Sequence, residues 1–194
     1  MPIFNKIELE IEGLCMLETE LYKDNRGYLF ESWNKKEFEN LGIHCNFVQD
    51  KVSFSKKGVL RGMHYQFPRP QAKFVRVLKG EVFDVVVDMR FNSPSFGKWF
   101  SVILSEENKL GLFIPENFAH GFLALSEEVI FFYKTSDFFF PEYDRGFKFD
   151  DEQIAIDWPL NSIEELFISN KDKNLPSFES ATEEMRKSYS KRIR

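Results

Sequence analysis

The sequence predicts a mostly β domain, a jelly-roll β-barrel with a few short helices outside it. Phenylalanine is unusually abundant, with 23 residues, many of them in short runs with valine, isoleucine and tyrosine. Aromatic and β-branched side chains fit the pleated, half-buried surface of a sheet. From Ala72 onward such runs recur roughly every ten residues with turn residues between them, which is typical of a sandwich or barrel. A chain of 194 residues forms one domain with a sizeable core.

The N-terminal part is predicted to contain short strands and one helix. Residues 6–22 form one or two strands, Asp24 to Gly27 is a turn signal, and Tyr28 to Trp33 resumes a strand. Asn34 and Glu37 resemble a capping box, and Gly42 follows as a stop, which predicts a helix over residues 35–41.

Strands continue along the rest of the chain. Residues 46–49 and 58–66 are candidate strands with Ser53 to Lys57 between them, and Lys79-Gly80 joins strands 73–78 and 82–88 as a hairpin. Residues 91–97 form a loop. Further strands are predicted over residues 99–104, 112–114, 121–125 and 129–134. Residues 150–156 are expected to hold a helical turn, and Ser180 to Glu183 to cap a charged C-terminal helix with a solvated tail over residues 191–194.

The composition argues against several functional classes. The net charge of −5 disfavours a nucleic-acid surface, although it is compatible with a local basic pocket for an anionic metabolite. No run approaches the ~20 apolar residues of a membrane span, and the N-terminus lacks the regions of a signal peptide. Cys15 and Cys45 imply no disulfide framework, which fits a reducing cytoplasm. We expect a cytoplasmic protein that binds neither nucleic acid nor membrane.

The stretch from Gly58 to Gln66 carries the most concentrated chemistry. It places Arg61, His64 and Gln66 between glycines and aliphatic residues typical of a strand edge. An imidazole beside apolar neighbours can stay neutral and accept a proton, and a guanidinium can hold a phosphate or carboxylate through its planar fork. A lone histidine in such surroundings is more often structural, so the assignment depends on partners elsewhere.

Three further polar residues have both an ordinary and a functional interpretation. Lys73 either faces water at a strand edge or stabilises a developing oxyanion in the barrel mouth. Tyr133 shares a strand face with Phe131, where it is either a core residue or a phenol that donates a proton to carbon. Asp172 has the pattern of a surface loop, but a carboxylate that reached His64 would orient the imidazole and stabilise its charged form.

His120 belongs to a motif of its own. Pro115-x-Asn117-x-x-His120 resembles the second cupin motif, in which glycine usually stands at the position of Asn117. Asparagine is the next best residue for a left-handed backbone, so the turn can survive the change. Metal-dependent cupins complete their ligand set with a His-x-His pair and a glutamate, whereas here the first motif offers only His64. With His44 in a loop as the third histidine, a three-histidine metal site is not expected.

Taken together, these residues resemble the dTDP-4-dehydrorhamnose 3,5-epimerase family of deoxysugar epimerases. The resemblance covers about residues 5–176, in order and with sensible spacing. The matching pieces are 24–27, Gln49, 61–66, 71–73, 84–90, 93–97, 104–108, 114–122, Tyr133-Lys134, 157–159 and Lys171-Asp172. The resemblance therefore implies one epimerase domain over residues 1–176, followed by a charged helix and tail over residues 177–194.

The resemblance implies a cupin-type jelly roll, a homodimer with exchanged N-terminal strands, and neither metal nor other cofactor. Its substrates are nucleotide-diphosphate-linked 4-keto-6-deoxy sugars, epimerised at C3, C5 or both. By motif position, His64 is the base that removes the proton α to the C4 ketone, and Asp172 orients it. Lys73 stabilises the enolate, and Tyr133 returns a proton from the opposite face. Inversion at carbon requires this division between an acid, a base and a stabiliser of charge.

A second group of residues falls where the family contacts the substrate. Phe139 stands where a tyrosine usually stacks on the base, and a phenyl ring can do the same. The residues at positions that contact the nucleotide diphosphate or the sugar are Arg26, Glu31, Gln49, Lys51, Arg61, His120, Asp144 and Lys171.

Departures from the family pattern leave the catalytic residues unchanged and concern positions that contact the substrate. Lys51 replaces the usual asparagine and adds charge and length to the pocket, and Asp144 replaces the usual glutamate. The substrate is therefore either a dTDP-linked hexose or a GDP-linked 6-deoxy-4-keto-heptose. The alternatives are a sugar-nucleotide 3,4-ketoisomerase of the same fold, which would follow Arg-Gly with His-x-His, a metal-dependent cupin oxygenase, or a non-catalytic sugar-binding cupin.

Overall fold

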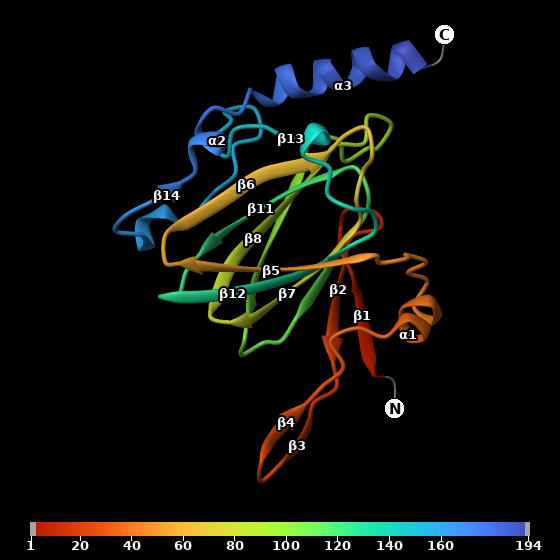
Figure 1. Cartoon of the computed structure of the whole chain (residues 1–194), viewed down its shortest axis with the longest axis vertical. Helices are drawn as coiled ribbons and strands as arrows, with labels where there is room; N and C mark the ends of the chain where they lie inside the picture. Colours follow the sequence, from red (N-terminus) through yellow and green to blue (C-terminus); the bar gives the residue numbers. More distant parts are fainter. Residues whose placement is uncertain (1–2, 193–194) are drawn as a thin grey trace.

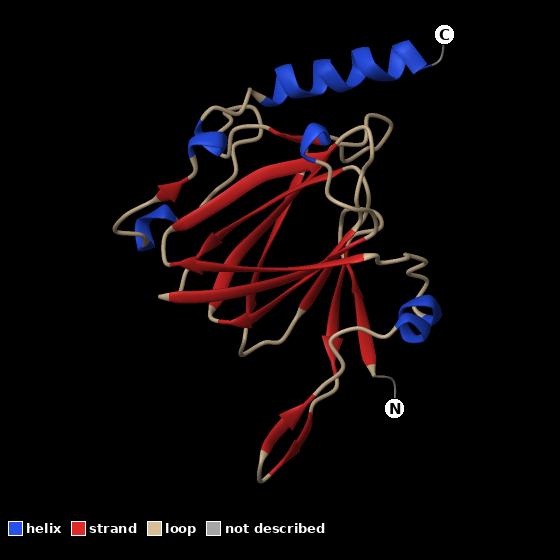
Figure 2. Cartoon of the chain, in the orientation of Figure 1, coloured by secondary structure: helices blue, strands red, loops and turns tan. Residues whose placement is uncertain are grey.

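Two curved β-sheets pack face to face to form the body of the molecule, as a computed structural model shows (Figures 1 and 2). The structure describes residues 3–192, and side chains through residue 188. The helices lie outside the sheets (Figure 2). The predicted jelly-roll barrel with peripheral helices is confirmed.

Each of the two sheets has a defined strand order. The first sheet runs β1 (Phe4–Glu8), β2 (Cys15–Thr19), β10 (Gly111–Ile114), β7 (Lys73–Lys79), β12 (Glu128–Thr135) and β5 (Gln49–Lys56). The second runs β13 (Asp144–Gly146), β6 (Val59–Gln66), β11 (Phe118–Ala124), β8 (Glu81–Asp88) and β9 (Trp99–Ser105), and β14 (Phe167–Ile168) pairs with β6 in parallel.

The predicted hairpin between β7 and β8 is wrong, because the two strands lie in different sheets. The turn at Gly80 is present, with φ 77°, but it carries the chain from one sheet to the other. A turn signal marks a sharp reversal without naming the neighbouring strand, and the jelly roll repeatedly crosses between its sheets. By contrast, β8 and β9 do pair as consecutive antiparallel strands across the loop that was predicted between them.

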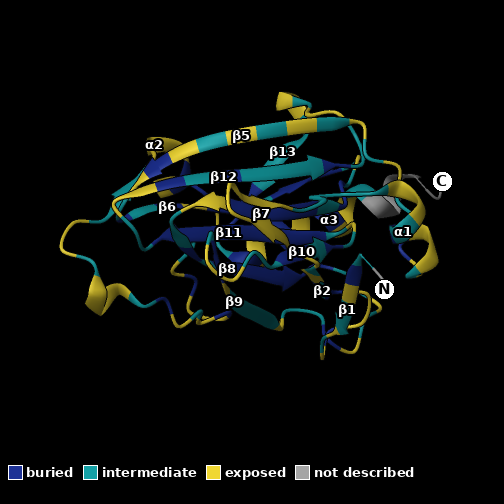
Figure 3. Ribbon diagram, turned by 90° about the horizontal axis from the view of Figure 1, so that it is seen from below, coloured by how far each residue is buried: buried dark blue, intermediate teal, exposed yellow. Residues whose placement is uncertain are grey.

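Strand β5 also differs from expectation. One strand covers Gln49–Lys56, where the sequence indicated a strand ending at Gln49 and a connection over residues 53–57. Lys51, Ser53 and Ser55 lie on its more buried face, whereas Val52 and Phe54 point outward and are 64% and 60% exposed. This inverted alternation of polar and apolar residues on an edge strand is what made the segment resemble a loop (Figure 3).

The N-terminal segment forms a hairpin and the predicted helix. Strands β3 (Tyr22–Asp24) and β4 (Gly27–Leu29) pair around the expected turn and extend away from the barrel (Figure 1). The strand predicted to continue to Trp33 ends at Leu29, where the pairing with β3 ends. Helix α1 (Lys35–Asn40) begins where Asn34 Oδ1 accepts a hydrogen bond from the Glu37 N–H, at 3.3 Å. The predicted cap is therefore confirmed.

The C-terminal segment covers the outside of the second sheet. It contains the 3₁₀ helices Pro141–Tyr143 and Leu160–Ser162, a turn closed by the Ala155 N–H and the Asp151 carbonyl, and helices α2 (Asn170–Lys173) and α3 (Phe178–Arg192). Helix α3 begins before the predicted cap, because the Ser177 hydroxyl accepts from the Ser180 N–H. The predicted tail over residues 191–194 lies outside the described side chains.

Apolar residues form three clusters that follow from the two-layer architecture. One cluster fills the barrel, and another lies between the second sheet and α3, so that Val86 faces inward while Val85 and Val87 face outward. The third cluster packs Phe38 of α1 against Phe74 on the outside of the first sheet. No helix among the described residues is long and apolar enough to cross a membrane.

Candidate active site

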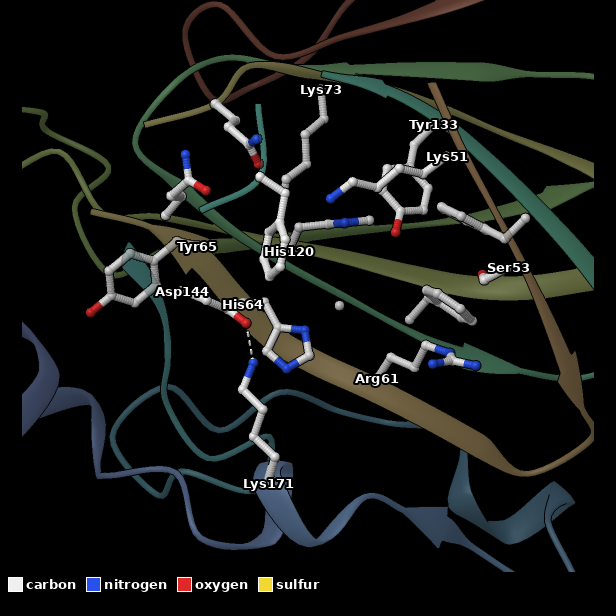
Figure 4. Close-up of a pocket in the computed structure, with 16 residues that line it drawn as sticks. Lys51, Ser53, Arg61, His64, Tyr65, Lys73, His120, Tyr133, Asp144 and Lys171 are labelled. Carbon is white, nitrogen blue, oxygen red and sulfur yellow. Dashed lines mark hydrogen bonds and ion pairs between the residues drawn. The ribbon is translucent and has the colours of Figure 1, made fainter. Parts of the chain in front are cut away.

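A cavity of about 220 Å³ opens between the two sheets at one end of the barrel (Figure 4). Strands of both sheets contribute side chains to it. Its lining residues are Lys51, Ser53, Arg61, His64, Tyr65, Gln66, Gln71, Lys73, His120, Gly121, Phe122, Phe131, Tyr133, Phe139, Asp144 and Lys171.

A local irregularity turns Arg61 and His64 toward the same cavity, although a regular strand would send them to opposite faces. The pairing of β6 with β11 shifts register here, with His64 opposite His120 and Arg61 opposite Phe122. Glycine is required where the strands approach, because a Cβ on Gly62 would lie 2.6 Å from the Cα of Gly121. The bulge therefore gathers the guanidinium and both imidazoles on one side of the sheet.

His64 is held by Asp172, which lies behind it at the edge of the second sheet. His64 Nε2 is 2.7 Å from Asp172 Oδ1, and Asp172 Oδ2 accepts from the Gly62 N–H at 3.5 Å. Helix α2 positions this carboxylate, and Ser169 caps the helix by accepting from the Asp172 N–H. Burial raises the pKa of Asp172, but hydrogen bonds from His64, Gly62 and Ser169 outweigh it and hold the pKa below the ordinary value.

His120 forms a second pair deeper in the barrel. Its Nε2 lies 2.9 Å from Asp84 Oδ2, and Asp84 has 0% exposure. Burial raises the pKa of Asp84, although the neighbouring His120 opposes this rise. The turn that precedes His120 uses Asn117 in the left-handed conformation, with φ 63°, as expected from the motif.

Lys73 and Tyr133 enter the cavity from the first sheet, across from His64 (Figure 4). Burial, followed by the charge of Lys51, lowers the pKa of Lys73 to about 8, while Asp144 and Asp84 act in the opposite direction. Burial also raises the pKa of Tyr133, which keeps this side chain a phenol at neutral pH.

Other charged residues surround these groups. Lys51 lies opposite Tyr133 across the β5–β12 pair, and its Nζ is 4.2 Å from the centre of the Phe139 ring. Lys171 forms an ion pair with Asp144. Arg61 donates to Ser55 Oγ and the Phe54 carbonyl.

Three glutamines hold the segment that carries Phe139. Gln49 Oε1 accepts from the Phe139 N–H at 3.1 Å. Gln66 donates to the Phe138 carbonyl and accepts from the Phe140 N–H, and Gln71 donates to the carbonyls of Asp137 and Phe138. We define residues 137–140 as the Phe139 loop. Side-chain amides therefore fix its backbone at the cavity rim.

The structure brings together most of the residues selected from the sequence. The catalytic candidates Lys73, His64 and Tyr133 line the cavity, and Asp172 contacts His64. Most of the binding candidates, Lys51, Arg61, His120, Phe139, Asp144 and Lys171, also line it, whereas Gln49 acts on the Phe139 loop.

Two binding candidates lie apart from this cavity. Arg26 is on the β3–β4 hairpin, where its side chain is 86% exposed and pairs with Asp24. Glu31 follows the hairpin and accepts from Asn34. A substrate contact by either residue stays a prediction.

Sequence reasoning gave no role in the site to Asp84, Ser53 or Gln71, although Asp84 and Gln71 lie in pieces that match the family. Asp84 could have been found, because it is a single acid in the middle of an apolar strand, where an unpaired carboxylate is costly. Ser53 stands in a segment predicted to lie between strands and Gln71 was assigned to no element, so no pattern gave either residue a face. Residues 3–192 contain no group of three or more His, Cys, Asp or Glu side chains placed to hold a metal ion, and both cysteines are free thiols.

Comparisons with known proteins agree with this geometry. Residues 8–180 match the family model described as dTDP-4-dehydrorhamnose 3,5-epimerase. The chain is similar to the dTDP-4-dehydrorhamnose 3,5-epimerases of Methanothermobacter thermautotrophicus, with 50% identity over 90% of this chain and 94% of the relative, and of Escherichia coli, with 50% identity over 88% and 92%.

A solved structure gives the same result for the fold. The chain is similar to dTDP-6-deoxy-D-glucose-3,5-epimerase RmlC from Legionella pneumophila, crystallised in complex with dTDP-4-keto-L-rhamnose. The two share 48% identity and superpose with a TM-score of 0.87, over 90% of this chain and 92% of the other.

Proposed function

The chain belongs to the dTDP-4-dehydrorhamnose 3,5-epimerase family, and we propose the residues by which it inverts C3 and C5 of a dTDP-linked 4-keto-6-deoxy sugar. It is an isomerase with a cupin-type barrel. The observation that carries the residue assignment is the placement of an imidazole and a phenol on opposite sheets, with an ammonium in the same cavity. A sugar ring lying between the sheets would present one face to each.

His64 is the base of this proposal. Because its Nε2 is engaged by Asp172, Nδ1 is the nitrogen left to take the proton from the carbon next to the C4 ketone. The C–H electron pair moves into the ring and an enolate forms, with the negative charge on the C4 oxygen. Asp172, whose lowered pKa favours its ionised form, stabilises the imidazolium that results.

Lys73 receives the enolate charge, and Tyr133 completes the inversion. A buried ammonium stabilises an oxyanion more strongly than one in water does, since little solvent screens it. Tyr133 then gives its hydroxyl proton to the same carbon from the other face and becomes a phenolate. Transfer of one proton from His64 to solvent and of one from solvent to Tyr133 resets the site for the second carbon.

The remaining cavity residues provide contacts for the nucleotide diphosphate and the sugar. Arg61 and Lys171 supply charge for phosphate oxygens. The fixed ring of Phe139 offers a stacking surface for the base. His120, held by Asp84, presents its other ring nitrogen to the sugar.

Arg26 and Glu31 stand at positions where the family contacts the substrate, yet in this chain both lie apart from the cavity. They could contact a substrate only in the cavity of a second copy. We therefore propose a homodimer in which the β3–β4 hairpin of one copy reaches the cavity of the other. Exposed apolar side chains support this, with Tyr22, Tyr28 and Leu29 on the hairpin 52%, 55% and 65% exposed. Val52 and Phe54 offer a further apolar surface on the outside of the first sheet.

The epimerase assignment is tested by proton NMR in D2O with dTDP- and GDP-linked 4-keto-6-deoxy sugars. We expect deuterium at C3 and C5 with the dTDP-linked hexose and slower exchange with GDP-linked sugars. Deuterium at C3 alone would reduce the function to a 3-epimerase. If the α-protons of none of these sugars exchange, the assignment fails.

The dimer is tested by mixing two impaired variants, Arg26→Ala and His64→Asn. In a mixed dimer, the cavity with an intact His64 receives an intact Arg26 from the other copy, so activity should reappear after subunit exchange. Sedimentation equilibrium provides the oligomeric state. A monomer, or a mixture that stays inactive although subunits exchange, would overturn the exchanged arrangement.

A further inference from the structure

Lys51 and Lys73 place two ammonium groups in the cavity, where the carboxylates of Asp144 and Asp84 act on them only at longer range. Lys171 pairs with Asp144, but no ion pair joins Lys51 or Lys73 to a carboxylate among the residues that the structure describes. Lining a single small cavity, these two ammonium groups repel each other when it is empty. The arrangement becomes favourable when negative charge develops between the two sheets.

Lys51 lies at the cavity wall, where it is half-buried. It lies directly opposite Tyr133 across the strand pair, with Nζ 5.8 Å from the centre of the Tyr133 ring. The Phe139 ring supports the same ammonium at 4.2 Å, and Gln49 fixes the backbone of Phe139. The Phe139 loop therefore determines where this charge lies.

We propose that Lys51 is a positioning residue for enolisation, whose ammonium adds a second positive charge to the cavity and so strengthens the hold of Lys73 on the enolate oxygen. The proposal rests on the function assigned to Lys73 above. Lys51 itself donates no proton to the sugar, and no bond to it forms or breaks. Its contribution is electrostatic and is larger in a cavity that excludes water.

The lowered pKa of Lys73 is consistent with this role. The charge of Lys51 lowers the pKa of Lys73, after burial, toward a value of about 8. A more acidic ammonium forms a stronger hydrogen bond to an enolate oxygen. The other titratable or charged groups that face this region are Arg61, His64, Asp84, His120, Tyr133, Asp144 and Lys171.

The experiment compares Lys51→Met and Lys51→Arg with a matched control, Lys56→Met. Lys56 lies on the same strand with its ammonium over the Phe167 ring at 3.4 Å, but outside the cavity. We expect Lys51→Met to lower kcat about 10- to 100-fold with little change in KM. The alkaline limb of its kcat profile should move to higher pH, because the pKa of Lys73 rises when Lys51 loses its charge.

The remaining variants give the other arms of the test. Lys51→Arg should keep both the rate and the alkaline limb, and Lys56→Met should match the wild type. Wild-type kcat in Lys51→Met, or a change in KM alone, would overturn the proposal. Lys73→Met tests the proposed function independently of the proposal for Lys51. Full activity of that variant would refute the assignment of Lys73, whatever the result for Lys51. Binding of dTDP to each variant serves as the check of folding.

Discussion

His64 and His120 lie opposite each other on neighbouring strands, and each binds an aspartate through Nε2, yet the surroundings of the two aspartates differ. Asp172 accepts an additional hydrogen bond from the Gly62 N–H, and its pKa is lowered. Asp84 is completely buried, and within the described residues His120 provides the only hydrogen bonds to its side chain. Burial therefore raises the pKa of Asp84.

This difference explains why two similar pairs can have different roles. A carboxylate that is kept ionised stabilises the positive charge formed when its histidine takes a proton. A carboxylate whose ionised form is disfavoured by burial gives less such help, but it still fixes the ring in one orientation. The comparison predicts that His64 takes up and releases protons during the reaction, while His120 is a fixed hydrogen-bonding group.

The largest effect should come from His64→Asn. We expect kcat to fall about 10³- to 10⁴-fold, because general-base catalysis is lost while the binding contacts remain. The measurement is incorporation of deuterium at C3 and C5 by NMR, with dTDP affinity as the control. Equal decreases in kcat for His64→Asn and His120→Asn would contradict the predicted difference between the two histidines.

Asp172→Asn should have the next largest effect, a decrease in kcat of about 10²-fold. The amide keeps the size of the side chain but does not stabilise an imidazolium. Steady-state rates over a range of pH provide the measurement, and circular dichroism shows whether the fold is retained. A variant with normal kcat would mean that His64 needs no charged partner.

His120→Asn should lower kcat/KM about 10-fold, the scale of one lost hydrogen bond. Most of the change should appear in KM, because this residue is proposed to bind the sugar and not to move its protons. Initial rates over a range of substrate concentration separate the two constants. A decrease confined to kcat would give His120 a part in the chemistry.

The smallest effects concern stability, and here the two aspartates should respond to pH in opposite directions. The folded pKa of Asp172 is below 3.8, so its contribution is present above that pH and disappears as the pH falls through the folded pKa. The folded pKa of Asp84 is above 3.8, so wild type should lose stability relative to Asp84→Asn as the pH rises. Urea unfolding should show differences of about 1–3 kcal/mol. Parallel pH curves for the two variants would contradict the assigned environments.

Much of the fold and of the site follows from local pattern. The barrel strands, the Asn34 cap and the left-handed turn at Asn117 depend on nearest neighbours and on side-chain periodicity, which the sequence displays directly. The catalytic set was selected through motif resemblance, and the structure brings His64, Lys73 and Tyr133 to one cavity with Asp172 behind His64.

The features that escaped prediction depend on long-range packing. The bulge at Gly62 arises where two glycines let β6 and β11 approach closely, and strict alternation would have separated Arg61 from His64. Strand β5 reverses the usual pattern because Lys51 and Ser53 on its inner face meet a polar cavity, while Val52 and Phe54 lie on its outer face. Whether β7 continues into a neighbouring strand or crosses to the other sheet is decided by the whole topology.

The glutamine clamp on the Phe139 loop bears on how this scaffold could be diversified. Gln49, Gln66 and Gln71 come from three separate segments and all bind the backbone of one short loop. Insertions or deletions in that loop would break several of these contacts together. A substitution at position 139 alone would leave these contacts intact, since they involve the main chain. New nucleotide preferences should therefore be accessible through single side-chain exchanges, and laboratory evolution of this enzyme should concentrate its libraries on that position and on Lys51.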